Sequence, residues 1–195
     1  MSDDLLYNDK PALRSRLLAR RRELSPEQRA AAAGALAERA LTLVPPGAVV
    51  AAYVSVGAEP GTRALLTALH ARAVPVLLPV LLPDNDLDWA RYDGDDRLAP
   101  AGRGLLEPTG PRLGPAAVCT ADLVLLPGLA VDRRGLRLGR GGGSYDRVLA
   151  RLAAAGVEPL LATLLYGHEL LAEVPAEPHD RPVHAAVTPD GVHRF

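Results

Sequence analysis

The stretch RLGRGGGSYDRVLARL, residues 137–152, sets three consecutive glycines after two arginines and before an amphipathic pattern that begins at Ser144. The apolar run DLVLLP, residues 122–127, precedes it and has the length of a buried strand. A strand, a glycine-rich loop and a helix start form an arrangement that binds phosphate, because backbone N–H groups turn inward and the helix N-terminus carries partial positive charge. A flexible turn with solvated arginines is the alternative, since ordering glycine costs much entropy.

Helical and strand patterns alternate along the rest of the chain. Helices are predicted over residues 9–23, 25–43, 62–72 and 144–155, with a capping box at Ser25 and Gln28. Strands are predicted over residues 48–56, 74–80, 122–127, 159–166 and 184–188, with a short outer strand over 87–92. Residues 93–120 are rich in Gly, Pro and Asp and are interpreted as a long excursion. We therefore expect a single α/β domain over 1–195, with a mostly parallel sheet flanked by helices on both faces.

Composition limits the possible partners. The 195 residues are 48% hydrophobic, and 22 Lys and Arg balance 23 Asp and Glu, so nothing draws the whole protein to nucleic acid or to a membrane. Cys119 is the one cysteine, which rules out a disulfide within the chain and fits a reducing compartment. No apolar run approaches the roughly 20 residues of a membrane span, and the acidic start is unlike a secretory signal. A cytoplasmic location is expected. Oligomeric state stays open, with a monomer favoured.

Two common phosphate motifs are absent. A Walker loop requires Gly-Lys-Ser/Thr after four spacer residues, and no such string occurs. A dinucleotide fingerprint would run from Gly139 through Gly141 to Ser144, with serine in place of the third glycine. Neither motif therefore accounts for the glycine loop.

The predicted N-terminal helix carries cations on its apolar side. Lys10, Arg14 and Arg21 fall within about 40° of one another on a helix that advances about 100° per residue. Leu13 and Leu17 lie on or beside the same face. Cations that face a core are costly unless an anion meets them, although long stems can also extend to water. A phosphate-binding face and a solvated face both remain possible from the pattern alone.

A longer string identifies a family. LLPGLAVDRRGLRLGRGGGSYDRVLAR, residues 125–151, resembles the PGLxFD and RLGRGxGYYD motifs of the 5-formyltetrahydrofolate cyclo-ligase family, also called methenyltetrahydrofolate synthetase. Three further patches match in order: Lys10 and Arg14 fit an N-terminal Lys-x-x-x-Arg, SVGAEPGT (55–62) fits a strand-end motif, and PAEPHDRPVHAAVT (175–188) fits the closing segment. The resemblance spans nearly the whole chain.

Four positions depart from the family pattern. Ser144 stands where the family usually has Tyr, and Val131 where it has Phe. Glu169 occupies a position that is often Gln, and His184 one that is usually acidic. Ser144 is also expected to cap the following helix. These departures bear on affinity and pocket shape rather than on the class of reaction.

The resemblance implies an enzyme that converts 5-formyltetrahydrofolate to 5,10-methenyltetrahydrofolate with ATP and Mg²⁺, releasing ADP and phosphate. ATP would phosphorylate the formyl oxygen, N10 would attack, and phosphate would leave as the ring closes. The protein would position the reactants and neutralise phosphate charge. A catalytically degenerate relative that binds ATP or folate is one alternative. A nucleic-acid- or partner-binding protein that uses the basic run RSRLLARRR, residues 14–22, is the other.

The resemblance also assigns roles to individual residues. It implies Arg140 and Tyr145 as catalytic residues and Asp146 and Asp180 as metal ligands. For ATP it implies Lys10, Arg14, Arg137, Leu138, Gly139, Arg140, Gly141, Gly142, Gly143, Ser144 and Tyr145. For folate it implies Val54, Glu59, Arg140, Gly141, Gly142, Gly143 and Ser144.

Several of these residues have simpler interpretations. Asp146 could act only on the helix dipole, and Glu59 could be a solvated turn residue. We interpret His179 as a loop residue, leave Arg21 unassigned, and give Trp89 no role.

Overall fold

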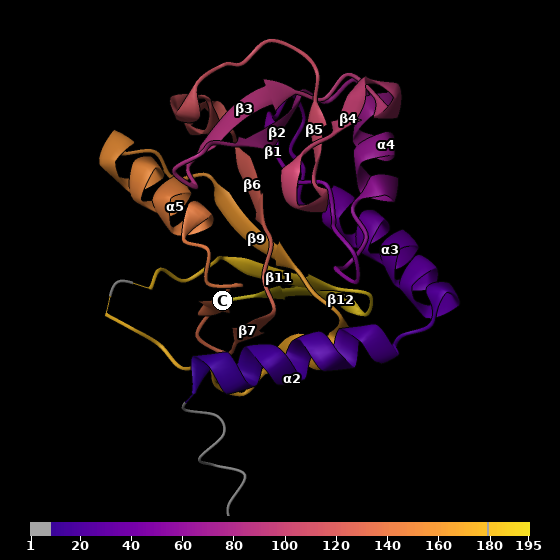
Figure 1. The fold of residues 1–195 in the computed structure, drawn as a ribbon, viewed down its shortest axis with the longest axis vertical. Coiled ribbons are helices and arrows are strands. Elements are labelled where there is room, and N and C mark those ends of the chain that lie inside the picture. The colour runs from indigo at the N-terminus through magenta and orange to yellow at the C-terminus, as the bar shows by residue number, and fades with distance from the viewer. Residues whose placement is uncertain (1–8, 179) are drawn as a thin grey trace, which may run out of the picture.

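A seven-stranded sheet forms the centre of the computed structural model, which describes residues 9–178 and 180–195 (Figure 1). The strand order is β12-β11-β9-β6-β1-β2-β3. The strands are β1 (Val50–Ala51), β2 (Val76–Leu81), β3 (Leu87–Arg91), β6 (Leu123–Leu126), β9 (Leu160–Leu164), β11 (Ala185–Thr188) and β12 (Gly191–Arg194). All neighbours pair in parallel except the two edge strands, β3 and β12. The predicted α/β class with a mostly parallel sheet is confirmed, while β12 had not been predicted.

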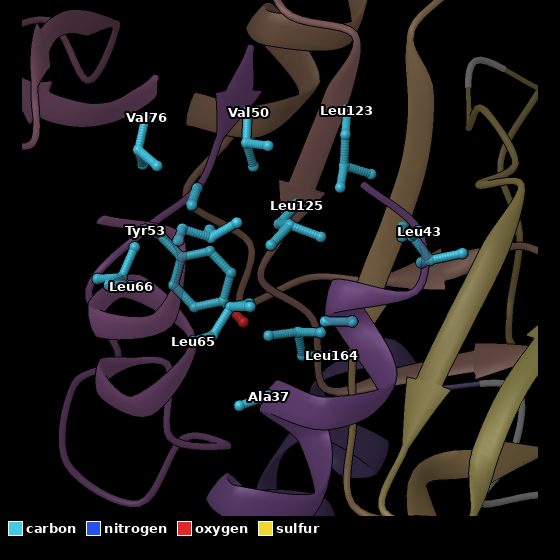
Figure 2. Packing of buried hydrophobic residues seen from close by; sticks show 14 of the residues in the cluster. Ala37, Leu43, Val50, Tyr53, Leu65, Leu66, Val76, Leu123, Leu125 and Leu164 are labelled. Atoms are coloured by element: carbon cyan, nitrogen blue, oxygen red, sulfur yellow. The ribbon is translucent and has the colours of Figure 1, made fainter. Parts of the chain in front are cut away.

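Helices cover both faces of this sheet, as predicted. The helices on this sheet are α3 (Pro26–Leu41), α4 (Arg63–Ala71) and α5 (Ser144–Ala155), whereas α2 (Lys10–Glu23) packs against a second, smaller sheet. Helices α3 and α4 pack on one face, and Figure 2 shows Ala37, Leu65 and Leu66 meeting side chains from the strands. Helix α5 packs on the other face through Val148, Leu149 and Leu152. The capping box of Ser25 and Gln28 is present at the start of α3. No helix in the described part of the chain is long and apolar enough to cross a membrane.

Strand β1 is much shorter than the predicted strand over residues 48–56. Its ladder to β2 pairs only Val50 with Val76 and Ala51 with Leu77, flanked by bonds from the Val50 N–H to the Pro75 carbonyl and from the Ala52 N–H to the Leu77 carbonyl. Beyond that point the apolar run leaves the sheet. Pro79 lies past the end of this ladder, so its missing N–H breaks no bond to β1.

The excursion over residues 93–120 is more structured than predicted. It contains 3₁₀ turns at Asp95–Arg97, Gly102–Gly104 and Pro115–Thr120, and an antiparallel hairpin of β4 (Leu98–Pro100) and β5 (Leu106–Pro108). Strand β5 contacts β2, and Glu107 Oε1 accepts a hydrogen bond of 2.9 Å from the Leu81 N–H. The hairpin is thereby fixed beside the central sheet.

A second, three-stranded sheet had no counterpart in the prediction. It consists of β7 (Ala130–Asp132), β8 (Arg137–Leu138) and β10 (Leu170–Leu171), in the order β10-β7-β8. Leu13 and Leu17 of α2 pack against it, and Figure 1 shows α2 running beside β7. Burial of these leucines fixes the face of α2 that carries the cations.

Asp132 closes the turn between β7 and β8. Its buried carboxylate accepts hydrogen bonds from the N–H groups of Arg134, Leu136 and Val174, and from the Arg134 guanidinium. Burial acts to raise the pKa of Asp132, but these donors outweigh it and hold the pKa below its ordinary value. The ionised side chain therefore contributes to stability.

We expect Asp132→Asn to destabilise the protein by about 2 kcal/mol, because an amide nitrogen must face an N–H donor. Since the native pKa is lowered, this carboxylate's contribution is present above about pH 4 and is lost as the pH falls further. Urea unfolding at pH 6 and pH 3 should show a gap between the two proteins that narrows in acid. A gap that is the same at both pH values would contradict an ionic role for Asp132.

Candidate active site

A cavity of about 490 Å³ opens where the order of the strands reverses. From β1 the chain passes through α4 to β2 on one side, whereas β6 lies on the other side of β1. Tyr53, Val54 and Glu59 follow β1, Pro127 and Gly128 follow β6, and all of them line the cavity. Ligands of open α/β sheets bind at such switch points, beyond the carboxyl ends of the strands.

The glycine loop forms one side of the cavity. Gly141 has φ of 92° and Gly143 has φ of 75°, both in the region that disfavours side chains. A Cβ on Gly141 would also lie 3.4 Å from the Arg14 guanidinium carbon. Gly143 is the N-cap of α5, so the first backbone N–H groups of that helix, which have no partner within it, adjoin the cavity. The prediction that Ser144 caps α5 is wrong, because Ser144 is already the first helical residue and makes no cap bond.

Arg137 is a buried cation beneath this loop. Its side chain is 8% exposed, and it donates 2.9 Å to the Pro127 carbonyl and 3.2 Å to Asp146. Its Nε has no acceptor among the described residues, and burial lowers the pKa of the guanidinium. An anion in the cavity would reduce the free-energy cost of burying this cation.

Helix α2 brings two further cations to the cavity. Lys10 Nζ lies 2.8 Å from Glu177 and 3.0 Å from Asp180. Arg14 donates 2.9 Å to the carbonyl of Gly139 and so connects α2 to the glycine loop. Two positions of the predicted cationic face therefore line the same cavity as the loop.

The third cation of that face, Arg21, is completely buried. It forms two hydrogen bonds to Glu169, of 2.6 and 2.9 Å, and donates 2.6 Å to the Gly128 carbonyl. Glu169 also accepts a bond from the Tyr166 N–H, and burial raises its pKa. The sequence had left Arg21 unassigned, although its place on the face of Leu13 and Leu17 was a signal of burial. The hydrogen bonds of Arg21 to Gly128 and Glu169 join α2 to the loop after β6 and to the segment after β9.

Glu59 is held by its own loop. Its Oε2 accepts 2.8 Å from the Val56 N–H, and Ser55 and Thr62 close the loop through two mutual backbone-to-hydroxyl bonds. The side chain is 10% exposed, and its Oε1 lies 3.5 Å from Arg140. Glu59 is thus an oriented carboxylate at the cavity wall rather than a solvated turn residue.

Tyrosines and aliphatic side chains complete the lining. Burial, with Glu59 nearby, raises the pKa of Tyr53 well above its ordinary value, and burial likewise raises that of Tyr145, so both hydroxyls stay protonated. An apolar wall comes from residues to which no site role had been given. Its members are Val56, Pro79, Leu81, Leu87, Leu105 and Leu106.

Two carboxylates at the cavity suit a hard cation. Asp146, in the first turn of α5, is 59% exposed, and Asp180 is 19% exposed. No cluster of three or more His, Cys, Asp or Glu able to hold a metal occurs within residues 9–178 and 180–195. Mg²⁺ fits this donor set, because it commonly binds through one or two carboxylates, water and phosphate oxygens.

The structure brings the predicted site residues together. Every one of them lines this single cavity: Lys10, Arg14, Val54, Glu59, Arg137, Leu138, Gly139, Arg140, Gly141, Gly142, Gly143, Ser144, Tyr145, Asp146 and Asp180. Tyr53, Arg21, Arg103 and Glu177 line it as well, without having been predicted to do so. His179 lies outside the described residues.

Comparisons with known proteins agree along most of the chain. A model of the 5-formyltetrahydrofolate cyclo-ligase family matches residues 7–189. A Mycolicibacterium smegmatis protein named 5-formyltetrahydrofolate cyclo-ligase is 42% identical over 185 residues, which cover 92% of this chain and 93% of that protein. An Escherichia coli K12 protein of the same name is 32% identical over 179 residues, covering 89% and 96%.

Solved structures give the same result. The NMR structure of Aquifex aeolicus 5,10-methenyltetrahydrofolate synthetase aligns with a TM-score of 0.75 at 28% identity, covering 95% of this chain and 92% of that one. A 5,10-methenyltetrahydrofolate synthetase from Mycoplasma pneumoniae shares the fold, with a TM-score of 0.72 at 18% identity over 93% and 99% of the chains. The resemblance inferred from the glycine loop is confirmed, and this chain belongs to the 5-formyltetrahydrofolate cyclo-ligase family.

Proposed function

We propose that this protein catalyses the ATP-dependent cyclisation of 5-formyltetrahydrofolate to 5,10-methenyltetrahydrofolate, with release of ADP and phosphate. The observation that carries the proposal is the single cavity in which the glycine loop, the α2 cations and the Glu59 loop meet. Membership of the family supplies the reaction class. The cavity supports it by pairing a phosphate-binding side with an apolar side, as the two substrates require.

The phosphate chain of ATP would lie against the glycine loop. Backbone N–H groups at the start of α5 would bind its oxygens, and Lys10, Arg14 and Arg137 would neutralise its charge. Arg137 gains most from this, because its Nε lacks an acceptor in the described part of the chain. Leu138 and Tyr145 would position the nucleotide from the sides of the loop. The protein's work is thus mainly placement and charge stabilisation.

The pterin of the folate would bind against Glu59, with Val54 beside it. Neighbouring N–H groups of a pterin can donate to a carboxylate, and Glu59 is already aimed by the Val56 N–H. That contact would compete with the 3.5 Å pair between Glu59 and Arg140. Arg140, which is 54% exposed, would then turn to the phosphoryl group being transferred, where positive charge is needed.

Asp146 and Asp180 would hold Mg²⁺, whose chemistry here is to neutralise charge on the phosphate oxygens. Both carboxylates have cationic neighbours, Arg137 and Lys10 respectively. Those cations would exchange their carboxylate partners for phosphate. We therefore infer that metal and nucleotide each bind more tightly in the presence of the other.

The alternative of a nucleic-acid-binding N-terminal helix has less support. Arg21 is buried with Glu169, and Lys10 and Arg14 line the cavity, so three of the helix's cations are already engaged. Leu13 and Leu17 hold the same face against the small sheet. A cytoplasmic location and a single domain stay predictions.

The proposed reaction is tested by following methenyltetrahydrofolate absorbance with the purified protein. We expect product only when ATP and Mg²⁺ are both present, together with matching release of ADP. Treatment with EDTA should stop turnover, and added Mg²⁺ should restore it. Turnover that survives EDTA would contradict the metal assignment, and binding of both substrates without product would favour a degenerate relative.

Lys10→Ala and Arg14→Ala should each raise the KM for ATP about tenfold and change the KM for folate little, because each removes one cation from the phosphates. Arg22→Ala is the matched control, since Arg22 is an exposed cation in the last turn of the same helix and does not line the cavity. If both substrates weakened equally and the melting temperature fell, the two cations would be structural instead.

A further inference from the structure

Arg103 occupies an unfavourable backbone conformation at the tip of the β4–β5 hairpin. Its φ is 61° and its ψ is 24°, in the left-handed region that a side chain disfavours. Gly102 and Gly104 flank it, so the turn places its one large side chain at a position that suits glycine. Left-handed residues other than glycine cost about 1 kcal/mol or more and occur frequently at functional sites.

The guanidinium of Arg103 lacks an anionic partner. It donates 3.0 Å to the neutral Oδ1 of Asn85, in the turn between β2 and β3. The carboxylates on either side of Asn85 are engaged by helix α5: Asp84 pairs with Arg147 at 3.4 Å, and Asp86 with Arg151 at 2.7 Å. Within the described residues, no carboxylate lies within ion-pair distance of Arg103. An arginine has five N–H donors, and most of those on Arg103 remain available.

Sheet topology places Glu59 and the contact that holds Arg103 beside different strands of the central sheet. The Glu59 loop follows β1, Pro79 and Leu81 lie on β2, and Leu87 begins β3. Asn85, which holds Arg103, lies between β2 and β3. Glu59 and the turn that holds Arg103 therefore follow different strands at the same edge of the sheet. Arg103 and the wall residues all line the same cavity.

This order matches the chemistry of a folate. Its pterin carries N–H donors suited to Glu59, its benzoyl ring is apolar, and its glutamyl tail ends in carboxylates. We propose that Arg103 binds a carboxylate of that glutamyl tail and makes the enzyme select folates that carry it. The inference rests on the proposed function, and it adds a residue that determines specificity at the folate end of the cavity.

Calorimetry tests the assignment without relying on turnover. Arg103→Gln should weaken binding of 5-formyltetrahydrofolate about tenfold, because a charge-assisted hydrogen bond is lost. Binding of 5-formyltetrahydropteroate, which lacks the glutamyl tail, should not change, and neither should binding of ATP. Arg147→Gln is the matched control: it removes another half-exposed arginine that contacts the same β2–β3 turn but does not line the cavity.

Arg103→Gly separates binding from the fold. Glycine suits the left-handed backbone, so the melting temperature should stay the same or rise while discrimination between the two folates is lost. If Arg103→Gln weakened both folates equally, or weakened ATP, the assignment to the glutamyl tail would be wrong. Failure of the wild-type protein to bind either folate would overturn the proposed function along with it.

Discussion

Asp146→Asn is expected to lower kcat about a hundredfold or more while the fold survives. The proposed role places this carboxylate on Mg²⁺, and an amide is a much weaker ligand for a hard cation. Its contribution to stability is small by comparison, because the side chain is 59% exposed and its ion pair with Arg137 is 3.2 Å long. Its place in the first turn of α5 adds a helix-dipole effect of about 0.3–1 kcal/mol.

Three measurements separate these two roles of Asp146. Kinetics should show the loss in kcat, thermal melting should show a shift of only a few degrees, and calorimetry should show that Mg²⁺ no longer strengthens ATP binding. Asp84→Asn is the control, since that carboxylate is 67% exposed and also pairs with an arginine, Arg147. Near-normal turnover with slightly lowered stability would show that Asp146 only stabilises the helix dipole and does not bind Mg²⁺.

The glycine loop could be predicted because its chemistry is local. A strand, three glycines and an amphipathic helix follow one another within about 30 residues, so the sequence itself places N–H groups, arginines and Asp146 together. The cationic face of α2 could likewise be predicted from helical spacing, and Lys10 and Arg14 line the cavity. Such features depend on spacing along the chain rather than on tertiary contacts.

The other features depend on contacts between distant parts of the chain, which hydrophobic periodicity does not predict. β7, β8 and β10 have only two or three residues each, too few for an alternating pattern to be recognised. The predicted strand over 48–56 is cut short because register with its neighbours lasts for two residues. Arg103 lies in a segment that shows neither helical nor strand periodicity, and the β4–β5 hairpin places it at the cavity.

Arg21 is the clearest example of a residue whose partner could not be predicted from the sequence. Its helix face indicated a cation beside the core, with phosphate binding and solvation both left open, and its partner, Glu169, lies 148 residues further along the chain. In the sequence, Glu169 stands out only as a departure from a position that is often glutamine in the family. In the structure that departure has a physical counterpart, because a carboxylate offers acceptors on both oxygens to Arg21 and to the Tyr166 N–H.

Arg21→Ala is therefore expected to destabilise the protein by about 3–5 kcal/mol, since it leaves the Glu169 carboxylate buried without its cation. Burial already raises the pKa of Glu169, and loss of Arg21 should raise it further. The native variant then binds a proton more tightly than its unfolded chain, so its stability falls as pH rises from about 4 through the raised pKa. Urea unfolding should accordingly show a larger deficit at pH 8 than at pH 5.

Two further variants identify the buried charge as the cause of this loss. Arg21→Met combined with Glu169→Gln should recover part of the stability, because no charge remains buried and the amide oxygen can still accept the Tyr166 N–H. Arg63→Ala breaks the exposed pair with Asp95 and should cost at most about 1 kcal/mol. If Arg21→Ala cost no more than Arg63→Ala, with no dependence on pH, Glu169 would not be a buried anion that needs its cation, and the connection of α2 to the rest of the site would rest on Leu13 and Leu17 instead.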